Sequence, residues 1–174
     1  HVRHGRADFG IVSTDIDGDE LAARVIYRDT MHAAYAPGHP LARRKQLRWA
    51  DLAAHEHITL RNVYSVRRAV DRISGELDLQ FQSGIEAGML TSVLNLARAG
   101  LGITVVPGYV CAFARQLGLV TAPIGGAGQR GQALWLIPRH SARLSLAADA
   151  FLADLEKTLR AREAAPDPTR YDED

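Results

Sequence analysis

The chain has 174 residues, of which 47% are hydrophobic and 24% charged, and its formal net charge is +1. This balance is typical of one soluble globular domain or two small lobes and argues against a disordered chain, and it supplies no field that would attract nucleic acid or an anionic membrane. The single cysteine excludes a disulfide framework and fits a reducing compartment, and no apolar run reaches the roughly 20 residues that cross a bilayer.

The first part of the chain is predicted to form strands. Short apolar runs bounded by polar or turn-forming residues predict three of them, at residues 7–13, 21–27 and 31–36. A basic stretch follows: residues 40–72 contain eight Arg or Lys residues and three Asp or Glu residues, a local charge of +5. We interpret this stretch as a solvated face, with a DNA-contacting patch as the alternative.

Helices and strands then alternate. Apolar residues at helical spacing predict one helical turn and three helices, at residues 49–54, 65–74, 87–99 and 109–117. Short β-branched or alternating apolar runs predict strands, at residues 57–60, 76–82, 103–106 and 119–124. This alternation indicates an α/β architecture with a largely parallel sheet.

The C-terminal part predicts one strand and one long helix. A glycine-rich connector at 125–131 precedes a strand at 132–137 and an amphipathic helix at 144–160. The polar residues 161–174 are expected to form a mobile tail.

Three sequence patterns are weak evidence for chemistry. Residues 126–131 match G-x-G-x-x-G, but Pro123 interrupts the preceding strand and another strand follows, so a hinge is a better interpretation than a dinucleotide site. His55 and His57 have no third ligand at metal-binding spacing, so we interpret them as surface histidines. Cys111 is interpreted as a buried thiol rather than a nucleophile. We therefore predict no catalytic residue, no metal and no cofactor.

Two segments suggest a binding function. Residues 61–65 join a predicted strand to a helix, where backbone N–H groups, the Arg61 guanidinium and the Ser65 hydroxyl can converge on a small anion. Helix capping by Asn62 or Ser65 is the alternative. Ser13 and Thr14 end the first strand, at the edge where open α/β sheets place ligands. If the two segments face one another across a hinge, they form a cleft.

Six short motifs occur in a characteristic order, at residues 5–11, 38–42, 49–52, 100–107, 134–139 and 144–148. They include Gly-Arg-Ala-Asp-Phe-Gly-Ile, Gly-His-Pro-Leu-Ala and Gly-Leu-Gly-Ile-Thr-Val-Val-Pro. Together they resemble the effector-binding domain of LysR-type transcriptional regulators over residues 2–160. The resemblance implies a two-lobed fold of the periplasmic-binding-protein type, with a small-molecule effector in the cleft between the lobes.

The resemblance also implies a division of the chain. The first lobe would comprise residues 1–38 and 128–160, and the second lobe residues 39–127. The first lobe is expected to be incomplete, because the chain starts later than the family's domain does. Contact with DNA is expected only through an N-terminal helix-turn-helix that this chain lacks. The full-length protein is expected to be cytoplasmic and to form a homodimer or homotetramer.

Carried over by position, the effector pocket would be lined by seven residues, namely Ser13, Thr14, Arg61, Asn62, Glu86, Ala87 and Pro107. Arg61 suggests a carboxylate-bearing effector, whereas Glu86 would repel one unless it faces away or pairs with Arg61. Two alternatives remain open. One is a periplasmic solute-binding protein of a transporter with the same fold, and the other is an enzyme on a related two-lobed fold, for which Glu86 and the histidines are the available acid–base groups.

Overall fold

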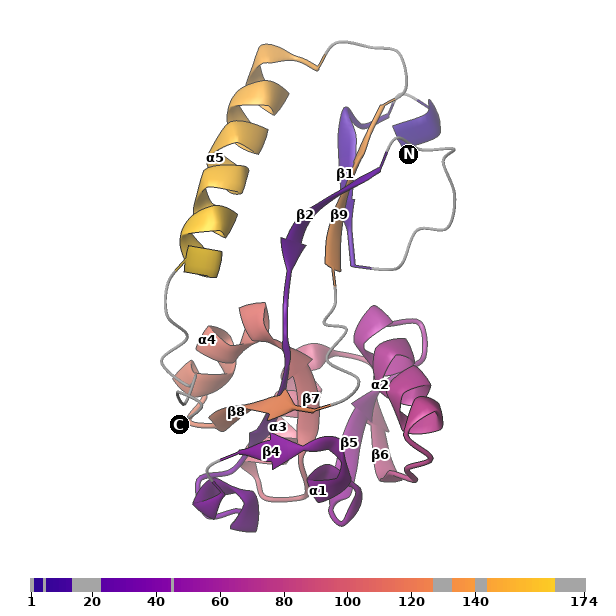
Figure 1. Cartoon of the computed structure of the whole chain (residues 1–174), viewed down its shortest axis with the longest axis vertical. Coiled ribbons are helices and arrows are strands. Elements are labelled where there is room, and N and C mark those ends of the chain that lie inside the picture. The colour runs from indigo at the N-terminus through magenta and orange to yellow at the C-terminus, as the bar shows by residue number, and fades with distance from the viewer. Residues whose placement is uncertain are drawn as a thin grey trace. The chain divides into compact units, whose positions relative to one another are not determined.

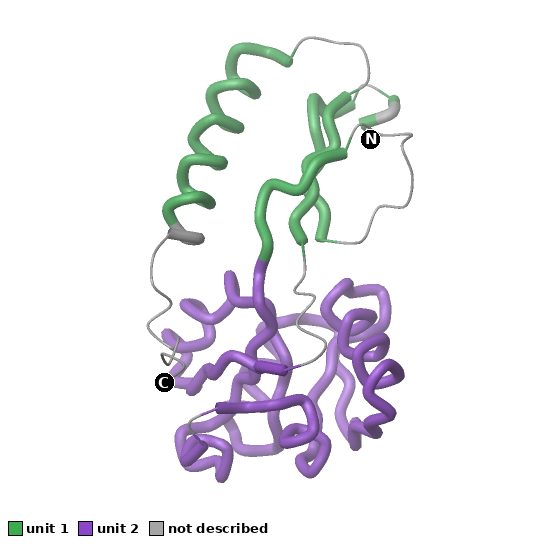
Figure 2. The backbone as a smooth tube through the Cα atoms, viewed as in Figure 1, with its two compact units in different colours: residues 1–28, 133–167 green, residues 29–132, 168–174 purple. Residues whose placement is uncertain are grey.

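The computed structural model describes residues 2–4, 6–13, 23–44, 46–126, 133–139 and 144–164, and Figure 1 shows its helices and strands. Two compact units are present (Figure 2). Unit 1 comprises residues 1–28 and 133–167, and unit 2 comprises residues 29–132 and 168–174. Within the described residues, the backbone therefore passes from one unit to the other after Arg28 and again before Ala133.

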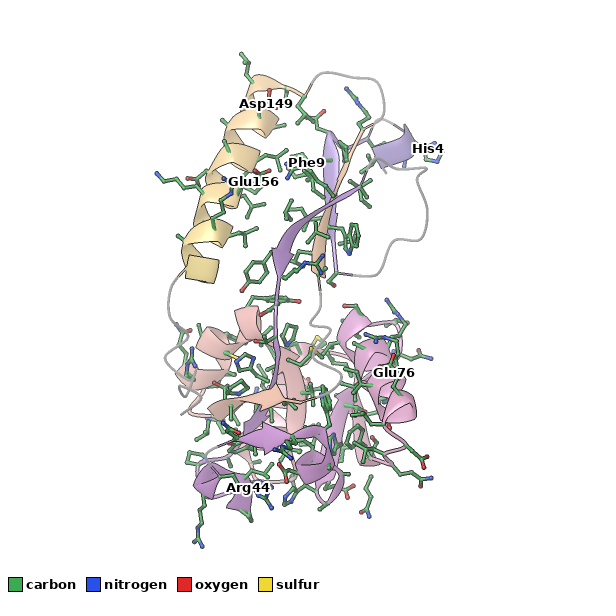
Figure 3. All side chains as sticks on the ribbon, in the orientation of Figure 1. His4, Phe9, Arg44, Glu76, Asp149 and Glu156 are labelled. Carbon is green, nitrogen blue, oxygen red and sulfur yellow. The ribbon has the colours of Figure 1, made fainter. Side chains whose placement is uncertain are left out.

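Unit 1 is built on a three-stranded sheet with the order β1-β9-β2, whose strands are β1 (Phe9–Val12), β9 (Ala133–Pro138) and β2 (Arg24–Arg28). Both pairings are antiparallel. The helix α5 (Leu146–Ala164) contacts β2. The ring of Phe9, which is labelled in Figure 3, stacks on that of Phe151 with centroids 5.9 Å apart. A short 3-10 helix, η1 (Val2–His4), precedes β1.

Unit 2 contains a four-stranded sheet and a parallel strand pair. The four strands, in the order β4-β8-β3-β7, are β4 (Leu47–Arg48), β8 (Val120–Gly125), β3 (Met31–Tyr35) and β7 (Thr104–Pro107). The pair is β5 (Glu56–Leu60) and β6 (Gln82–Ala87). A parallel bridge between His57 and Ile103 connects the two groups, with the Ile58 N–H donating to the Ile103 carbonyl at 2.8 Å.

Parallel pairing, as predicted, is found in unit 2, between β5 and β6 and between β4 and β8, but not among the described strands of unit 1. Helices α2 (Ser65–Glu76), α3 (Leu90–Arg98) and α4 (Gly108–Gln116) connect β5, β6, β7 and β8 in turn. Such helical crossovers return the chain parallel to the preceding strand. β3 is antiparallel to both β7 and β8, and the described strands of unit 1 pair only antiparallel. These strands are not joined to their neighbours by a helical crossover, so the parallel prediction was wrong for them.

The core of unit 2 lies between this sheet and its helices. The helices bury one side each, through Val66, Val70 and Ile73 of α2, Val93, Leu94 and Ala97 of α3, and Val110, Cys111 and Ala114 of α4. The short helix α1 (Trp49–Ala53) contributes Trp49 and Leu52. A 3-10 turn, η3 (Pro40–Arg43), buries Leu41. None of the described helices has the length and apolar character of a membrane span.

The predicted strand at 76–82 is wrong. α2 continues to Glu76, and the chain then turns: Leu77 N–H donates to the Ile73 carbonyl at 3.0 Å, and Asp78 has a φ of 50°. The strand of this region is β6, so the helix expected from residue 87 begins only at Leu90. Leu77, Leu79 and Phe81 do pack against the core. The alternation of apolar residues therefore indicates which side chains are buried, and a turn can bury alternate side chains as well as a strand can.

Two further expectations differ from the structure, and a third lies mostly outside the described residues. β3, which the sequence-based division put in the first lobe, pairs with β7 and β8 in unit 2. Residues 161–164, expected in a mobile tail, are the last turn of α5, and residues 165–174 lie outside the described residues. Of the glycine-rich pattern at 126–131, the structure describes Gly126 alone, which has a φ of 99°.

Candidate functional site

Two loops of unit 2 follow parallel strands and meet at the same edge of the sheet. β5 and β6 are in register with Leu60 opposite Ala87, so residues 61–64 and 88–89 leave the sheet side by side. We call these two loops the strand-end surface. The Tyr64 hydroxyl donates to the Gly88 carbonyl at 2.7 Å and connects the loops. The Arg61 guanidinium lies beside Gly88, where an added Cβ atom would be 3.6 Å from the Arg61 Cζ.

The strand-end surface is held in shape by hydrogen bonds to its backbone carbonyls. The Tyr64 N–H donates to the Arg61 carbonyl at 3.0 Å and closes a turn. Arg68, one turn into α2, donates from Nη1 to the Asn62 and Val63 carbonyls at 3.0 and 2.8 Å. Within the described part of the chain, no hydrogen bond or ion pair involves the Arg61 guanidinium. Arg61 is therefore an exposed cation on a loop whose backbone is held by hydrogen bonds.

Two helices begin at this surface. The N-cap residues of α2 and α3 are Tyr64 and Met89, and neither makes a side-chain capping hydrogen bond. The N-cap position is thus taken by Tyr64 rather than by Asn62 or Ser65, and Ser65 is the first helical residue. The first N–H groups and the positive dipole ends of α2 and α3 lie at the surface next to Arg61. Val63 and Met89 are 72% and 62% exposed, which adds apolar area.

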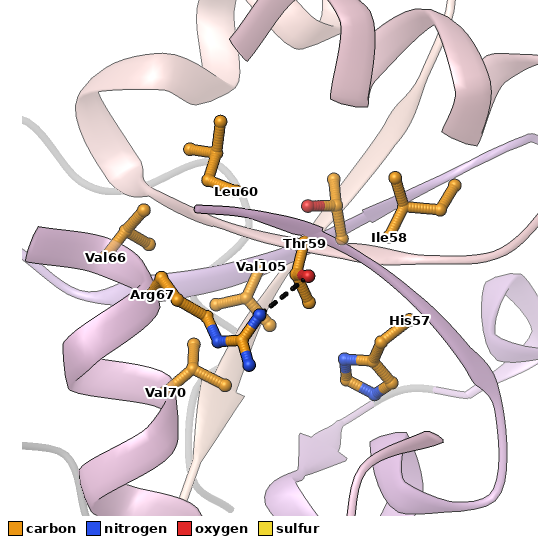
Figure 4. A pocket seen from close by; sticks show the side chains of 9 residues that line it. His57, Ile58, Thr59, Leu60, Val66, Arg67, Val70 and Val105 are labelled. Carbon is orange, nitrogen blue, oxygen red and sulfur yellow. Dashed lines mark hydrogen bonds between the residues drawn. The ribbon is translucent and has the colours of Figure 1, made fainter. Parts of the chain in front are cut away.

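Glu86 does not pair with Arg61. It stands opposite Thr59 in the β5–β6 register, and its carboxylate lies 3.7 Å from Arg67 Nη1. Arg67 also donates to the Thr59 hydroxyl at 2.8 Å (Figure 4) and from Nε to both carboxylate oxygens of Asp71 at 2.8 and 2.9 Å. Glu86 therefore belongs to a polar network with Arg67 and Thr59 beneath α2 and does not pair with Arg61.

A half-open pocket of ≈ 290 Å³ lies beside this network (Figure 4). It is lined by residues of β5, α2 and β7, namely His57, Ile58, Thr59, Leu60, Val66, Arg67, Val70, Thr104 and Val105. None of the seven predicted site residues lines it. Its walls are mainly apolar, and two of its polar side chains, Arg67 and Thr59, already bond to each other, so we regard it as a packing hollow rather than the predicted site.

The other predicted site residues lie in different surroundings. Ala87 is half-buried against the core, and Pro107 is buried at the end of β7. Ser13 follows β1 in unit 1 and is half-buried, and Thr14 lies outside the described residues. Among the predicted residues, the structure brings Arg61 and Asn62 together on the exposed surface.

The expectation that His55 and His57 are surface histidines is wrong for His57. His57 is 1% exposed, its Nε2 lies 2.9 Å from the Leu52 carbonyl oxygen, and its ring is 4.5 Å from that of Phe81. His55 instead contacts His39, with ring centroids 4.6 Å apart. Burial lowers the pKa of His57 and of His39. In the described part of the chain, no group of three His, Cys, Asp or Glu side chains is placed to hold a metal ion.

Two compact α/β units, between which the described part of the chain crosses twice, are typical of the two-lobed periplasmic-binding-protein-like fold. Residues 1–160 match the family model described as LysR substrate binding domain. The chain therefore belongs to the LysR substrate-binding domain family, as the ordered motifs predicted, and this family is not an enzyme family.

The curated relatives of the chain are transcriptional regulators of Escherichia coli (strain K12). The chain is 26% identical over 147 residues to the uncharacterized HTH-type transcriptional regulator YbhD. The aligned region covers 84% of this chain and 46% of that protein. It is 36% identical over 70 residues to the transcriptional activator protein LysR, covering 40% of the chain and 22% of that protein. The chain thus spans less than half the length of these relatives. Because both are transcriptional regulators, they disfavour the transporter alternative.

Solved structures confirm the fold. The effector-binding domain of QuiR in complex with shikimate has a TM-score of 0.75 at 17% identity, covering 92% of this chain and 75% of that one. The effector-binding domain of BenM with its effector benzoate has a TM-score of 0.74 at 16% identity, covering 99% and 78%. OxyR (C206 mutant) from Corynebacterium glutamicum has a TM-score of 0.77 at 22% identity, covering 92% and 50%.

Proposed function

We propose that this chain is the small-molecule-sensing domain of a cytoplasmic, DNA-binding LysR-type regulator and has no catalytic activity of its own. Unit 1 corresponds to the first lobe and unit 2 to the second. DNA is contacted by another part of that regulator, which acts as a homodimer or homotetramer. An effector that prefers one conformation of the domain shifts its equilibrium, and a coupling of about 1 to 3 kcal/mol suffices for a 5- to 150-fold response.

The strand-end surface is the unit 2 part of the effector site in this proposal. The observation that supports it best is the Arg61 guanidinium, which lies beside Gly88 and next to the starts of α2 and α3. A cation and two positive helix ends favour an anion, and a guanidinium binds a carboxylate through two parallel hydrogen bonds. Benzoate and shikimate, named for BenM and QuiR, are carboxylates. We therefore assign a carboxylate-bearing effector.

Replacing Arg61 by Ala is expected to weaken carboxylate binding about 10- to 100-fold, because a hydrogen bond to a charged group contributes roughly 1.5 to 3 kcal/mol. A panel of small carboxylates that includes benzoate and shikimate is first screened by thermal shift, and affinities are then measured by isothermal titration calorimetry. Arg98→Ala is the matched control, since Arg98 is also exposed but lies in the last turn of α3.

Two outcomes would contradict the assignment. Equal affinities of Arg61→Ala and the wild type would remove Arg61 from the site. If no carboxylate of the panel binds while neutral or cationic compounds do, the effector class is wrong.

A further inference from the structure

The start of α4 differs from the starts of α2 and α3, because a carboxylate from elsewhere in the chain occupies it. Asp29 is 6% exposed, and its Oδ2 accepts a hydrogen bond from the backbone N–H of Tyr109 at 2.9 Å. Its Oδ1 accepts from the N–H of Thr30 at 2.8 Å. The N-cap of α4 is Pro107, which makes no side-chain capping bond. Asp29 therefore caps a helix that begins about 80 residues later in the chain.

The backbone next to Asp29 reinforces this contact. The Gly108 N–H donates to the Thr30 carbonyl at 3.0 Å, and Nδ1 of the buried His32 lies 3.3 Å from the same oxygen. Residues 29 and 30 are thus joined to the first turn of α4 by both a side chain and the main chain. We call this set of bonds the Asp29 clamp.

Gly108 makes the approach of the carboxylate possible. A Cβ atom at position 108 would overlap Oδ1 of Asp29 and lie 3.2 Å from Cε1 of His32. These neighbours are buried, so they have little room to move aside. Glycine is therefore the residue that lets the clamp close.

A buried carboxylate is retained at a cost in solvation. Burial raises the pKa of Asp29, and the N–H groups of Tyr109, Thr30 and Gly108 together with His32 act in the opposite direction. The N-terminus of a helix offers an anion both N–H donors and a positive dipole, which offsets part of this cost. A packed apolar residue at position 29 would avoid the cost but would leave the first N–H groups of α4 unpaired.

The clamp lies where the chain enters unit 2. β2 ends at Arg28 in unit 1, and residue 29 is the first residue of unit 2. We propose that Asp29 is a positioning residue that fixes the connecting segment to α4, so that the bending of this connection is confined to residues before Asp29. The consequence for signalling rests on the proposed function. If the connecting segment is rigid after Arg28, a conformational change in one unit is transmitted to the other and is not absorbed by bending of the connection.

Hydrogen exchange of the chain without ligand tests the clamp itself. In Asp29→Ala, exchange of the Tyr109 and Thr30 amides is expected to become about 2- to 30-fold faster, the range that corresponds to the loss of a helix cap. Gly108→Ala is expected to have the same local effect by displacing the carboxylate. Asp149→Asn is the matched control, because Asp149 is an exposed acid in the first turn of α5. If exchange instead rises evenly throughout unit 2, Asp29 has only a general stabilising role and the proposal fails.

Distances between the units test the consequence. Spin labels are placed at two exposed positions, Lys157→Cys in α5 and Arg98→Cys in α3; the native Cys111 is buried and does not compete. The distance distribution from pulsed electron resonance is expected to broaden in Asp29→Ala and to stay unchanged in Asp149→Asn. An unchanged distribution in Asp29→Ala would overturn the proposal. Because no effector is used, this result does not depend on whether a carboxylate binds at Arg61.

Discussion

Replacing Gly102 by Ala is expected to lower the free energy of unfolding of unit 2 by about 2 to 4 kcal/mol. Gly102 has a φ of 155°, and a Cβ atom there would lie 2.5 Å from the backbone oxygen of Glu56 and 3.1 Å from its carbonyl carbon. This oxygen accepts the hydrogen bond of Ile103 N–H at 2.9 Å, one of the bonds that connect β5 to β7. The methyl group can therefore be accommodated only by separating the two strands.

Gly84→Ala is the matched control for this prediction. A Cβ atom at position 84 would also meet Glu56, but at the end of its exposed, flexible side chain. That side chain can rotate away, so we expect a change within about 0.5 kcal/mol. The two variants thus add the same methyl group next to the same residue, and they differ in whether backbone or side chain must move.

Urea unfolding followed by tryptophan fluorescence measures both variants. The chain has two tryptophans, Trp49 in unit 2 and Trp135 in unit 1, so a Trp135→Phe background makes the signal specific for unit 2. Similar losses of stability in both glycine variants would show that the strand contact at Gly102 is not the determining feature.

The helices of unit 2 were predictable because their signals are local. Apolar residues at helical spacing placed α2, α3 and α4, and glycines mark where two of them end: Gly100 and Gly118 have φ values of 81° and 83°. At such positions glycine avoids the strain that a side chain would cause. The strand pattern at 76–82 failed because an alternation of apolar residues depends on which side chains are buried and not on backbone geometry.

The candidate site was predictable only in part. Arg61 could be proposed from the sequence because it lies between a buried strand and an amphipathic helix. The pairing of Glu86 with Arg67 could not be predicted, because the choice between Arg61 and Arg67 depends on the β5–β6 register and on the face that α2 covers. Asp29 has no local signal at all: its partner Tyr109 lies 80 residues away, and contacts of this kind follow from tertiary structure alone.

Lowering the pH from about 7.5 to 5.5 is expected to destabilise unit 2 through His57. This imidazole lies in the core, and the Leu52 carbonyl is its hydrogen-bond partner within the described residues. Burial lowers the pKa of His57 below its ordinary value of 6.5; the proximity of His55 acts in the same direction, while the Leu52 carbonyl and Glu56 oppose it. The unfolded chain therefore takes up a proton near pH 6.5, whereas the folded chain takes it up only at a lower pH.

The sign of the effect follows from this difference in bound protons. Where the unfolded state binds more protons, the free energy of unfolding falls as the pH falls, by at most about 1.4 kcal/mol per pH unit for one histidine. His57→Gln, which keeps an N–H donor for the Leu52 carbonyl but does not titrate, is expected to remove this part of the pH dependence. His4→Gln, at an exposed position in unit 1, is expected to retain it.

Urea unfolding at several pH values, again in the Trp135→Phe background, separates His57 from the other titrating groups. Burial and the proximity of His55 lower the pKa of His39, which therefore contributes with the same sign. The pKa of Asp29 is raised above its ordinary value of 3.8, so protonation of Asp29 favours the folded state. This contribution to the free energy of unfolding is lost as the pH rises above 3.8, which is the opposite pH dependence to that of His57. Both groups are present in the wild type and in His57→Gln, so the difference between the two curves isolates His57. Parallel curves would mean that His57 is not the group that makes the core of unit 2 sensitive to acid.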